Sequence, residues 1–308
     1  MTFREYVKNN FERIYYINLD SRKDRRDRCI EIFKQYDVYD IVERIPGKVF
    51  TEKEIREDFV KFTGHVNHIN PDKYDYTPKT LGRWGCTTGH LRALQHAKDN
   101  NIENILIFED DLEIYNGKDD TVQDYGEILE NANKTLQNIK WDLHYLGYYP
   151  CPARGLWSNP KALGPNIFTA SYLQATHAVA YNKRAYSKIL EDLLPSKNSF
   201  KWRELLGTID EYLGFIFQNY PDYTTTAIAP ILVYQRADWS DIQCESKDYT
   251  PAYLKNSILM LRDRVPDDFI RFPIRPGKKT NAFCKMNKKC EWDRISKEEY
   301  ERFAANNF

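Results

Sequence analysis

The segment "NILIFEDDLEIY", residues 104–115, places three acidic side chains directly after an apolar run. Residues 105–108 have the length and composition of a buried strand. Glu109, Asp110 and Asp111 follow without a break. Adjacent carboxylates raise one another's pKa unless a cation compensates their charge. The segment therefore predicts a strand that ends in a cation-binding site.

The acidic ligands indicate which kind of cation this site would hold. Hard divalent ions such as Mn²⁺ and Mg²⁺ prefer oxygen ligands. Strand side chains alternate between two faces, so Glu109 and Asp111 are expected on one face and Asp110 on the other if the strand continues. A site with few protein oxygens leaves coordination positions of the metal open for substrate phosphates. We therefore predict Mn²⁺ or Mg²⁺ bound by Glu109 and Asp111. A solvated strand end with capping acids stays open as the alternative.

The composition limits the class of protein. A chain of 308 residues is long enough for one large domain, with or without an appendage. Lys plus Arg and Asp plus Glu number 45 each, and this balance argues against nucleic-acid binding. No apolar stretch has the length of a signal peptide core or a membrane span, so we expect a soluble protein that is cytoplasmic or internal to a host cell.

Helical and strand patterns alternate along the chain. This alternation predicts an α/β fold with a largely parallel sheet, and such sheets bind ligands at the carboxyl ends of their strands. Residues 47–80 are polar and contain Gly and Pro, which predicts a long loop or short helices. Strands are expected at residues 13–19, 105–108, 141–147, 177–182 and 225–235, and helices within 20–36, 85–101, 119–139, 183–194 and 208–220.

The pattern weakens after about residue 245. Residues 271–294 contain eight basic and two acidic side chains. We predict a catalytic domain over 1–245 and a basic extension over 246–308 that packs on or beside it, as a solvated surface or for an anionic partner. The six cysteines are expected to be free thiols, and a disulfide between Cys284 and Cys290 stays open.

Several motifs occur in an order typical of one family. The chain resembles glycosyltransferase family 25 over residues 11–243. That family includes bacterial lipooligosaccharide galactosyltransferases and collagen hydroxylysine galactosyltransferases. The resemblance rests on "YYINLDSRKDRRDR", "GCTTGHLRAL", "ILIFEDDLEIY", "WDLHYLG", "THAVAYNKRAYSKIL", "TIDEYLG" and "WSDIQ".

The resemblance implies a fold, a donor and a cofactor. The fold would be of the GT-A type, a Rossmann-like, mostly parallel sheet flanked by helices. The donor would be a UDP-sugar, with Mn²⁺ bound by the acidic triplet. Two departures are visible: Gly89 precedes His90 where the family usually has Ser, and Asp20 stands where the collagen enzymes often have Arg.

The end of the first predicted strand is the expected donor site. Asn18 and Asp20 lie there, where a GT-A domain holds its nucleotide. Arg22 and Arg25 follow and are expected to reach uridine or phosphates, although a solvated helix start is an equal alternative. Asp110 is expected to bind the metal or the ribose.

The remaining candidates concern proton transfer and the acceptor. Asp210 matches an acid of the family pattern, and we nominate it as the base that takes the acceptor's proton if the anomeric centre inverts, with Glu211 as the substitute. Asp241 is expected to orient the acceptor or the metal. His90 and His177 are expected to lie near the acceptor, to contact the metal ligands without binding the metal, or to serve only in packing.

Together these expectations describe a metal-dependent enzyme that transfers a hexose, with galactose preferred, from a UDP-sugar to a hydroxyl group. The acceptor is hydroxylysine of a collagen-like protein or a lipooligosaccharide-type glycan. Two alternatives remain: a retaining UDP-glucosyltransferase that acts on a glycosylated acceptor, and a noncatalytic protein that binds nucleotide sugars or glycans.

Overall fold

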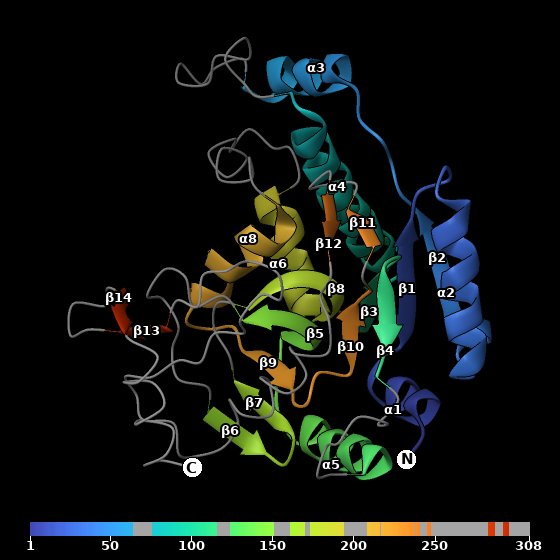
Figure 1. Cartoon of the computed structure of the whole chain (residues 1–308), viewed down its shortest axis with the longest axis vertical. Helices are drawn as coiled ribbons and strands as arrows, with labels where there is room; N and C mark the ends of the chain where they lie inside the picture. Colours follow the sequence, from blue (N-terminus) through green and yellow to red (C-terminus); the bar gives the residue numbers. More distant parts are fainter. Residues whose placement is uncertain are drawn as a thin grey trace.

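An eight-stranded sheet forms the centre of the molecule (Figure 1). The computed structural model describes residues 1–63, 76–115, 124–150, 161–169, 173–193, 208–215, 217–236, 238–240, 245–247, 283–286 and 292–295. The strand order is β2-β1-β3-β8-β5-β9-β7-β6. The strands are β1 (Arg13–Asn18), β2 (Val42–Pro46), β3 (Asn104–Glu109), β5 (Leu143–Pro150), β6 (Lys161–Gly164), β7 (Ile167–Thr169), β8 (Leu173–Asn182) and β9 (Thr225–Ile228).

Most strands of this sheet run in one direction. Strand β1 is parallel to β2 and β3, and β5 is parallel to β9. Strand β8 is antiparallel to β3 and β5, whereas β7 is antiparallel to β9 and β6. Strands β8 and β7 therefore oppose the other six. This arrangement confirms the predicted α/β class with a mostly parallel sheet.

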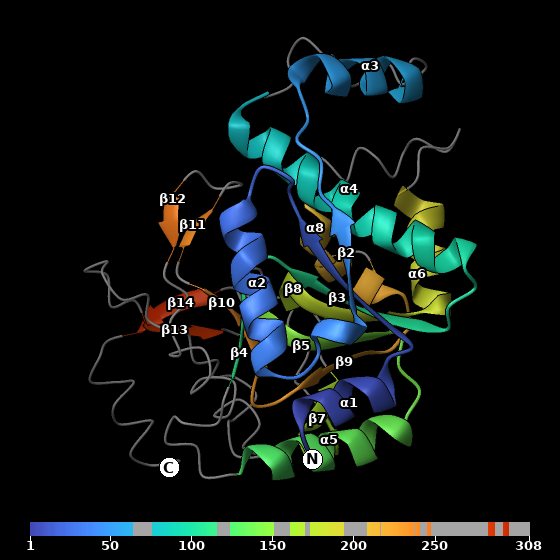
Figure 2. The same cartoon turned by 90° about the vertical axis from the view of Figure 1, so that its right-hand side faces the viewer.

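Helices cover both faces of the sheet (Figure 2). One face packs against α1 (Phe3–Asn10), α2 (Lys23–Gln35) and α5 (Tyr125–Gln137). The other face packs against α4 (Pro78–Asp99), α6 (Lys183–Leu193) and α8 (Ile209–Phe215). Helix α3 (Glu52–Thr63) lies beyond the first turns of α4, at the top of both views.

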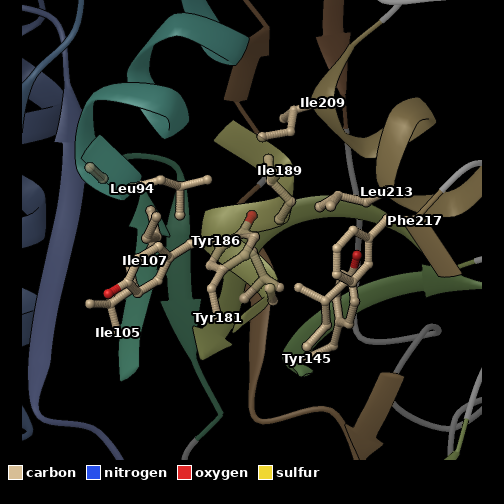
Figure 3. Close-up of a cluster of buried hydrophobic side chains, with 14 of the residues drawn as sticks. Leu94, Ile105, Ile107, Tyr145, Tyr181, Tyr186, Ile189, Ile209, Leu213 and Phe217 are labelled. Carbon is tan, nitrogen blue, oxygen red and sulfur yellow. The ribbon is translucent and has the colours of Figure 1, made fainter. Parts of the chain in front are cut away.

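The alternation of apolar residues in β3 explains the two cores. Ile105 and Ile107 belong to the cluster that includes α4, α6 and α8, whereas Leu106 and Phe108 belong to the opposite cluster. Burying each such side chain contributes about 1.5–3 kcal/mol. Figure 3 shows part of the first cluster, with side chains from β3, β5, β8, α6 and α8. The strand that leads to the acidic triplet is therefore fixed from both sides.

Three small hairpins or strand pairs and two short 3-10 helices complete the described parts of the chain. The pair of β4 and β10 matters for the site, because it holds residues 233–235 beside the segment that follows the triplet. The pairs are β4 (Leu112–Ile114) with β10 (Val233–Gln235), β11 (Asp238–Ser240) with β12 (Glu245–Lys247), and β13 (Phe283–Met286) with β14 (Trp292–Ile295); the 3-10 helices are η1 (Tyr39–Ile41) and η3 (Phe217–Asn219).

Some predicted boundaries were wrong. Helix α4 begins at Pro78, seven residues before the expected start, and proline suits the first turn of a helix because that turn needs no amide donor there. The strand expected over 225–235 is two strands, because Pro230 has no N–H to continue the ladder. The predicted helix over 208–220 ends at Phe215 and is followed by η3. No helix among the described residues has the length and apolarity to cross a membrane.

Candidate active site

The acidic triplet lies at the edge of the sheet where β1 and β3 end and β8 begins. The parallel register pairs Ile17 with Glu109, so Asn18 lies beside the residue after β3. The antiparallel register pairs Phe108 with Ala178, so the first half of β8 passes the same edge. Strand ends of this kind are the usual ligand site in α/β sheets.

Asp110 is held in a buried ion pair. Arg25 donates to its Oδ1 at 2.7 Å, and the Asn18 amide donates to its Oδ2 at 2.8 Å. Burial raises the pKa of Asp110, and the Arg25 charge opposes that shift. Removing one partner of a buried ion pair lowers the free energy of unfolding by about 3–5 kcal/mol. Asp110 therefore fastens α2 to the end of β3.

Arg44 extends this network from β2. Its guanidinium donates to the Asn18 side chain at 3.1 Å, to the Asn18 carbonyl at 3.0 Å and to Asp20 at 2.5 Å. Asp20 itself is largely exposed. Arg22 pairs with Asp24 in the same turn at 2.9 Å. The predicted donor residues thus share one edge, where Asn18, Arg25 and Asp110 are buried.

Glu109 faces the opposite side of the strand, toward α4. His90 Nε2 lies 3.1 Å and Cys86 Sγ 3.9 Å from Glu109 Oε1, and the Thr176 hydroxyl donates to the same oxygen at 2.6 Å. Burial raises the pKa of Glu109, but the bonds from His90 and Thr176 outweigh burial and lower it. Glu109 is therefore kept charged, and it faces opposite to Asp110 as the alternation predicts.

Asp111 has the least satisfied carboxylate of the three. Strand β3 ends before it, and its Oδ2 lies 3.3 Å from Gln235 Nε2 and 4.0 Å from the Arg25 guanidinium. Its Oδ1 is buried and has no hydrogen-bond partner in the part of the chain that the structure describes. Burial and the charge of Glu109 raise the pKa of Asp111 to about 7. This oxygen is available as a ligand.

An irregular segment of β8 connects the triplet to α8. Ala178 pairs with Gly147, and Gln174 pairs with Tyr149, so residues 175–177 bulge out of the ladder. Ala175 has a φ of 66°, a left-handed conformation that is unusual for a residue with a side chain. Such bulges redirect side chains near functional sites.

Each residue of this bulge contacts a different part of the site. The Ala175 amide donates to Asp210 Oδ2 at 3.4 Å, the Thr176 hydroxyl binds Glu109, and His177 Nε2 lies 3.0 Å from the Val233 carbonyl. A Cβ on Gly147 would lie 2.2 Å from His177 Nε2, so only glycine leaves room for that ring. The bulge therefore connects Glu109 with Asp210 through adjacent residues.

Asp210 lies in the first turn of α8. Burial raises its pKa to about 6, and the charges of Glu211 and Glu109 act in the same direction. Its Oδ1 accepts from the Thr208 hydroxyl and from the Glu211 amide. Glu211 Oε2 accepts from the Thr208 amide at 3.3 Å, which caps the helix. A carboxyl group with a pKa near 6 suits general-base chemistry at neutral pH.

The structure brings most predicted site residues to one edge of the sheet. Asp241 lies outside the described residues. Thr176 and Arg44 were not among the predicted site residues. Thr176 begins the motif "THAVAYNKRAYSKIL", but nothing in the sequence shows that its hydroxyl reaches Glu109, and no motif marks Arg44, which reaches Asn18 because β2 pairs with β1. The residues brought together are Asn18, Arg25, His90, Glu109, Asp110, Asp111, His177 and Asp210.

A mostly parallel α/β sheet thus carries an acidic cluster at its strand ends, with a further half-buried carboxylate, Asp210, nearby. The family model described as glycosyltransferase family 25 (LPS biosynthesis protein) matches residues 11–146. The chain is therefore similar to glycosyltransferase family 25 over these residues, which make up less than half of its length.

Three curated proteins are similar to most of this chain. Procollagen galactosyltransferase 2 of Mus musculus is 23% identical over 239 residues, which cover 74% of this chain and 35% of that protein. Procollagen galactosyltransferase 1-A of Xenopus laevis is 26% identical, with 74% and 36% covered. A glycosyltransferase 25 family member of Aedes aegypti is 24% identical, with 68% and 31% covered. The chain spans about a third of the length of these relatives.

Proposed function

We propose that this chain transfers galactose from UDP-galactose to a hydroxyl group of an acceptor, and that the reaction requires Mn²⁺ or Mg²⁺. The names of the curated relatives support the sugar. The observation that carries the metal requirement is the buried Oδ1 of Asp111, which has no hydrogen-bond partner among the described residues. A buried acceptor of this kind needs a compensating partner.

The residues present fit a hard divalent cation. Asp111 and Glu109 supply carboxylate oxygens, the ligands that Mn²⁺ and Mg²⁺ prefer. The raised pKa of Asp111 reflects burial beside another negative charge, a state that a cation would relieve. Asp110 is already neutralised by Arg25. We therefore assign Asp111 and Glu109 as the ligands.

The protein's own groups would divide the remaining work. A bound divalent cation would offset the charge that gathers on the departing diphosphate. Asn18, Asp20 and Arg22 would contact the nucleotide, with Arg25 and Asp110 fixing the floor of that site. Asp210 would accept the proton of the attacking hydroxyl as the sugar is transferred, with inversion at the anomeric carbon.

Two acceptors are consistent with the comparisons. The names of the vertebrate relatives point to a hydroxyl group of a collagen chain, and the description of the family model points to a lipopolysaccharide glycan. Both carry a hydroxyl that Asp210 could deprotonate. Both therefore belong in the same assay.

The test is a panel of UDP-sugars, each with Mn²⁺ or EDTA and with a collagen-like peptide or a lipooligosaccharide core as acceptor. We expect UDP release from UDP-galactose that needs the metal and one acceptor. Asp111→Asn should abolish release, whereas Asp99→Asn, an exposed change on α4, should not. Full Mn²⁺-dependent release by folded Asp111→Asn would overturn the metal assignment. UDP binding without release would indicate a binding protein, and the product anomer by NMR would reveal retention.

A further inference from the structure

Three side chains of different chemistry converge on the α4 side of the triplet. Cys86 and His90 lie one turn apart on α4, and Glu109 ends β3. Cys86 Sγ, His90 Nε2 and a Glu109 carboxylate oxygen all lie within 4.8 Å of one another. His90 is fully buried, and Glu109 is 19% exposed. The cluster is thus built into the core and accessible from one side.

The separations match those of ligands around a tetrahedral zinc ion. With Zn–N and Zn–O bonds of about 2.0–2.1 Å and a Zn–S bond of about 2.3 Å, tetrahedral angles place N and O about 3.3 Å apart and S and O about 3.6 Å apart. The corresponding distances here are 3.1 Å for His90 Nε2 to Glu109 Oε1 and 3.9 Å for Cys86 Sγ to Glu109 Oε1. These two distances lie within a few tenths of an ångström of the tetrahedral values, and the third pair, Cys86 Sγ and His90 Nε2, lies within 4.8 Å.

The surroundings of the cluster support the imidazole as a ligand. Tyr181 Oη lies 3.3 Å from His90 Nδ1. A phenol both donates and accepts, so His90 keeps this partner in either neutral tautomer, including the one that leaves Nε2 free for a metal. Partners of this kind orient metal-binding histidines.

We propose that Cys86, His90 and Glu109 form a second cation site that binds thiophilic divalent ions such as Zn²⁺, and that its occupancy inhibits sugar transfer. On binding, a zinc–sulfur bond forms and the thiol proton of Cys86 leaves to water. Inhibition would follow because Glu109 is shared with Asp111, the ligand of the proposed Mn²⁺ site. The inhibition rests on the proposed function, whereas zinc binding does not.

The two sites differ in ligand chemistry. Sulfur and imidazole ligands favour zinc, whereas the carboxylate oxygens of Asp111 and Glu109 favour Mn²⁺ and Mg²⁺. Each site can therefore be removed by its own substitution while the other site is kept. Cys86→Ser removes the thiolate from the second site and leaves Asp111 intact. Asp111→Asn does the reverse.

The experiment uses the full chain in the metal-free form. Co²⁺ is added to the wild type, Cys86→Ser and Asp111→Asn, and thiolate-to-cobalt charge-transfer absorption is recorded. Zn²⁺ affinity is measured by competition with a chromophoric chelator, and thermal unfolding verifies each fold. We expect charge transfer in the wild type and Asp111→Asn but not in Cys86→Ser. Loss of the thiolate should weaken Zn²⁺ binding by more than 100-fold, since even partners behind a ligand contribute about 10- to 100-fold.

Transfer assays in Mn²⁺ complete the test. Added Zn²⁺ should inhibit the wild type, and Cys86→Ser should remain active at zinc concentrations that stop the wild type. Absence of charge transfer in the wild type, or equal Zn²⁺ affinity of the wild type and Cys86→Ser, would overturn the site. Tight zinc binding without any transfer activity would overturn the proposed function and leave the site standing.

Discussion

At the level of single residues, three adjacent carboxylates acquire three chemical characters. Asp110 is paired with Arg25, Glu109 is kept charged by His90 and Thr176, and Asp111 remains partly unsatisfied. The cause is geometric, because each carboxylate faces a different neighbouring element. The triplet thereby consists of one anchoring residue, Asp110, and the two residues that we propose as metal ligands.

The pH dependence of transfer should report Asp210. A base must be deprotonated, and burial raises its pKa to about 6, so kcat/KM should fall about tenfold for each pH unit below 6. Asp210→Asn should lower the rate by about 10²- to 10⁴-fold and abolish the decrease of kcat/KM at acidic pH. Glu211→Gln, a change in the cap of the same helix, should keep that decrease. A pH profile unchanged in active Asp210→Asn would exclude Asp210 as the base.

His144 should make the fold sensitive to acid. Tyr6 and Thr226 bind its two ring nitrogens at 3.1 and 2.9 Å, and burial lowers its pKa to about 3. In the unfolded chain the His144 pKa is about 6.5, so on acidification the unfolded chain is protonated at this residue before the folded chain. The contribution of His144 to the free energy of unfolding is therefore fully present above pH 6.5 and falls by about 1.4 kcal/mol per pH unit as the pH decreases toward 3. Urea unfolding between pH 7 and 4 should show a weaker decline for His144→Gln. Equal slopes would contradict this assignment.

At the level of elements, the bulge in β8 determines how the site is assembled. Residues 175–177 contact α8, the end of β3 and β10 in turn. Ala175 makes its contact through the main-chain amide, which the bulge leaves out of the ladder, whereas Thr176 and His177 make theirs through side chains. The bulge therefore gives three consecutive residues three partners.

Thr176→Val tests the part of the bulge that contacts Glu109. The change keeps the shape and removes the hydroxyl that donates at 2.6 Å. We expect transfer to fall about 10- to 100-fold, with a higher Mn²⁺ requirement, as when a partner behind a metal ligand is lost. Thr225→Val in β9 is the control, because the Thr225 hydroxyl is buried with no hydrogen-bond partner among the described residues. Equal activity of both variants would argue against the role.

Sequence patterns predicted the elements better than their irregularities. The apolar run 105–108 and its alternation place Glu109 and Asp110 on opposite sides, as the structure confirms. The bulge could not be anticipated, because Ala175 takes a left-handed conformation without the glycine that usually marks one. Arg44 reaches Asn18 only because β2 pairs with β1, and pairing order depends on contacts distant in sequence.

At the level of the whole molecule, the two large hydrophobic clusters of the described residues come from the first part of the chain. Their buried members all lie between Phe3 and Val233 in the portion that the structure describes. The predicted boundary at 245 falls at the start of β12, which pairs with β11. The smallest unit that keeps this pair ends at Lys247.

A chain truncated after Lys247 should fold and retain metal-dependent transfer. We expect one cooperative thermal transition that loses no more than about 1 kcal/mol, equivalent to about 2–4 °C for a domain of this size. Calorimetry of the full chain and of the truncated chain provides the measurement. An aggregated or unfolded truncation product would show that residues 248–308 belong to the folding unit.

The position of β8 determines when the sheet can close during synthesis. Strands β3 and β5 both pair with β8 and not with each other. A nascent chain that has reached residue 170 therefore carries two bare strand edges, separated by the width of one missing strand. Bare edges recruit strands from other chains. Translation through residues 173–182 supplies the strand that covers both of these edges, whereas the other edge of β5 stays bare until β9 has been made.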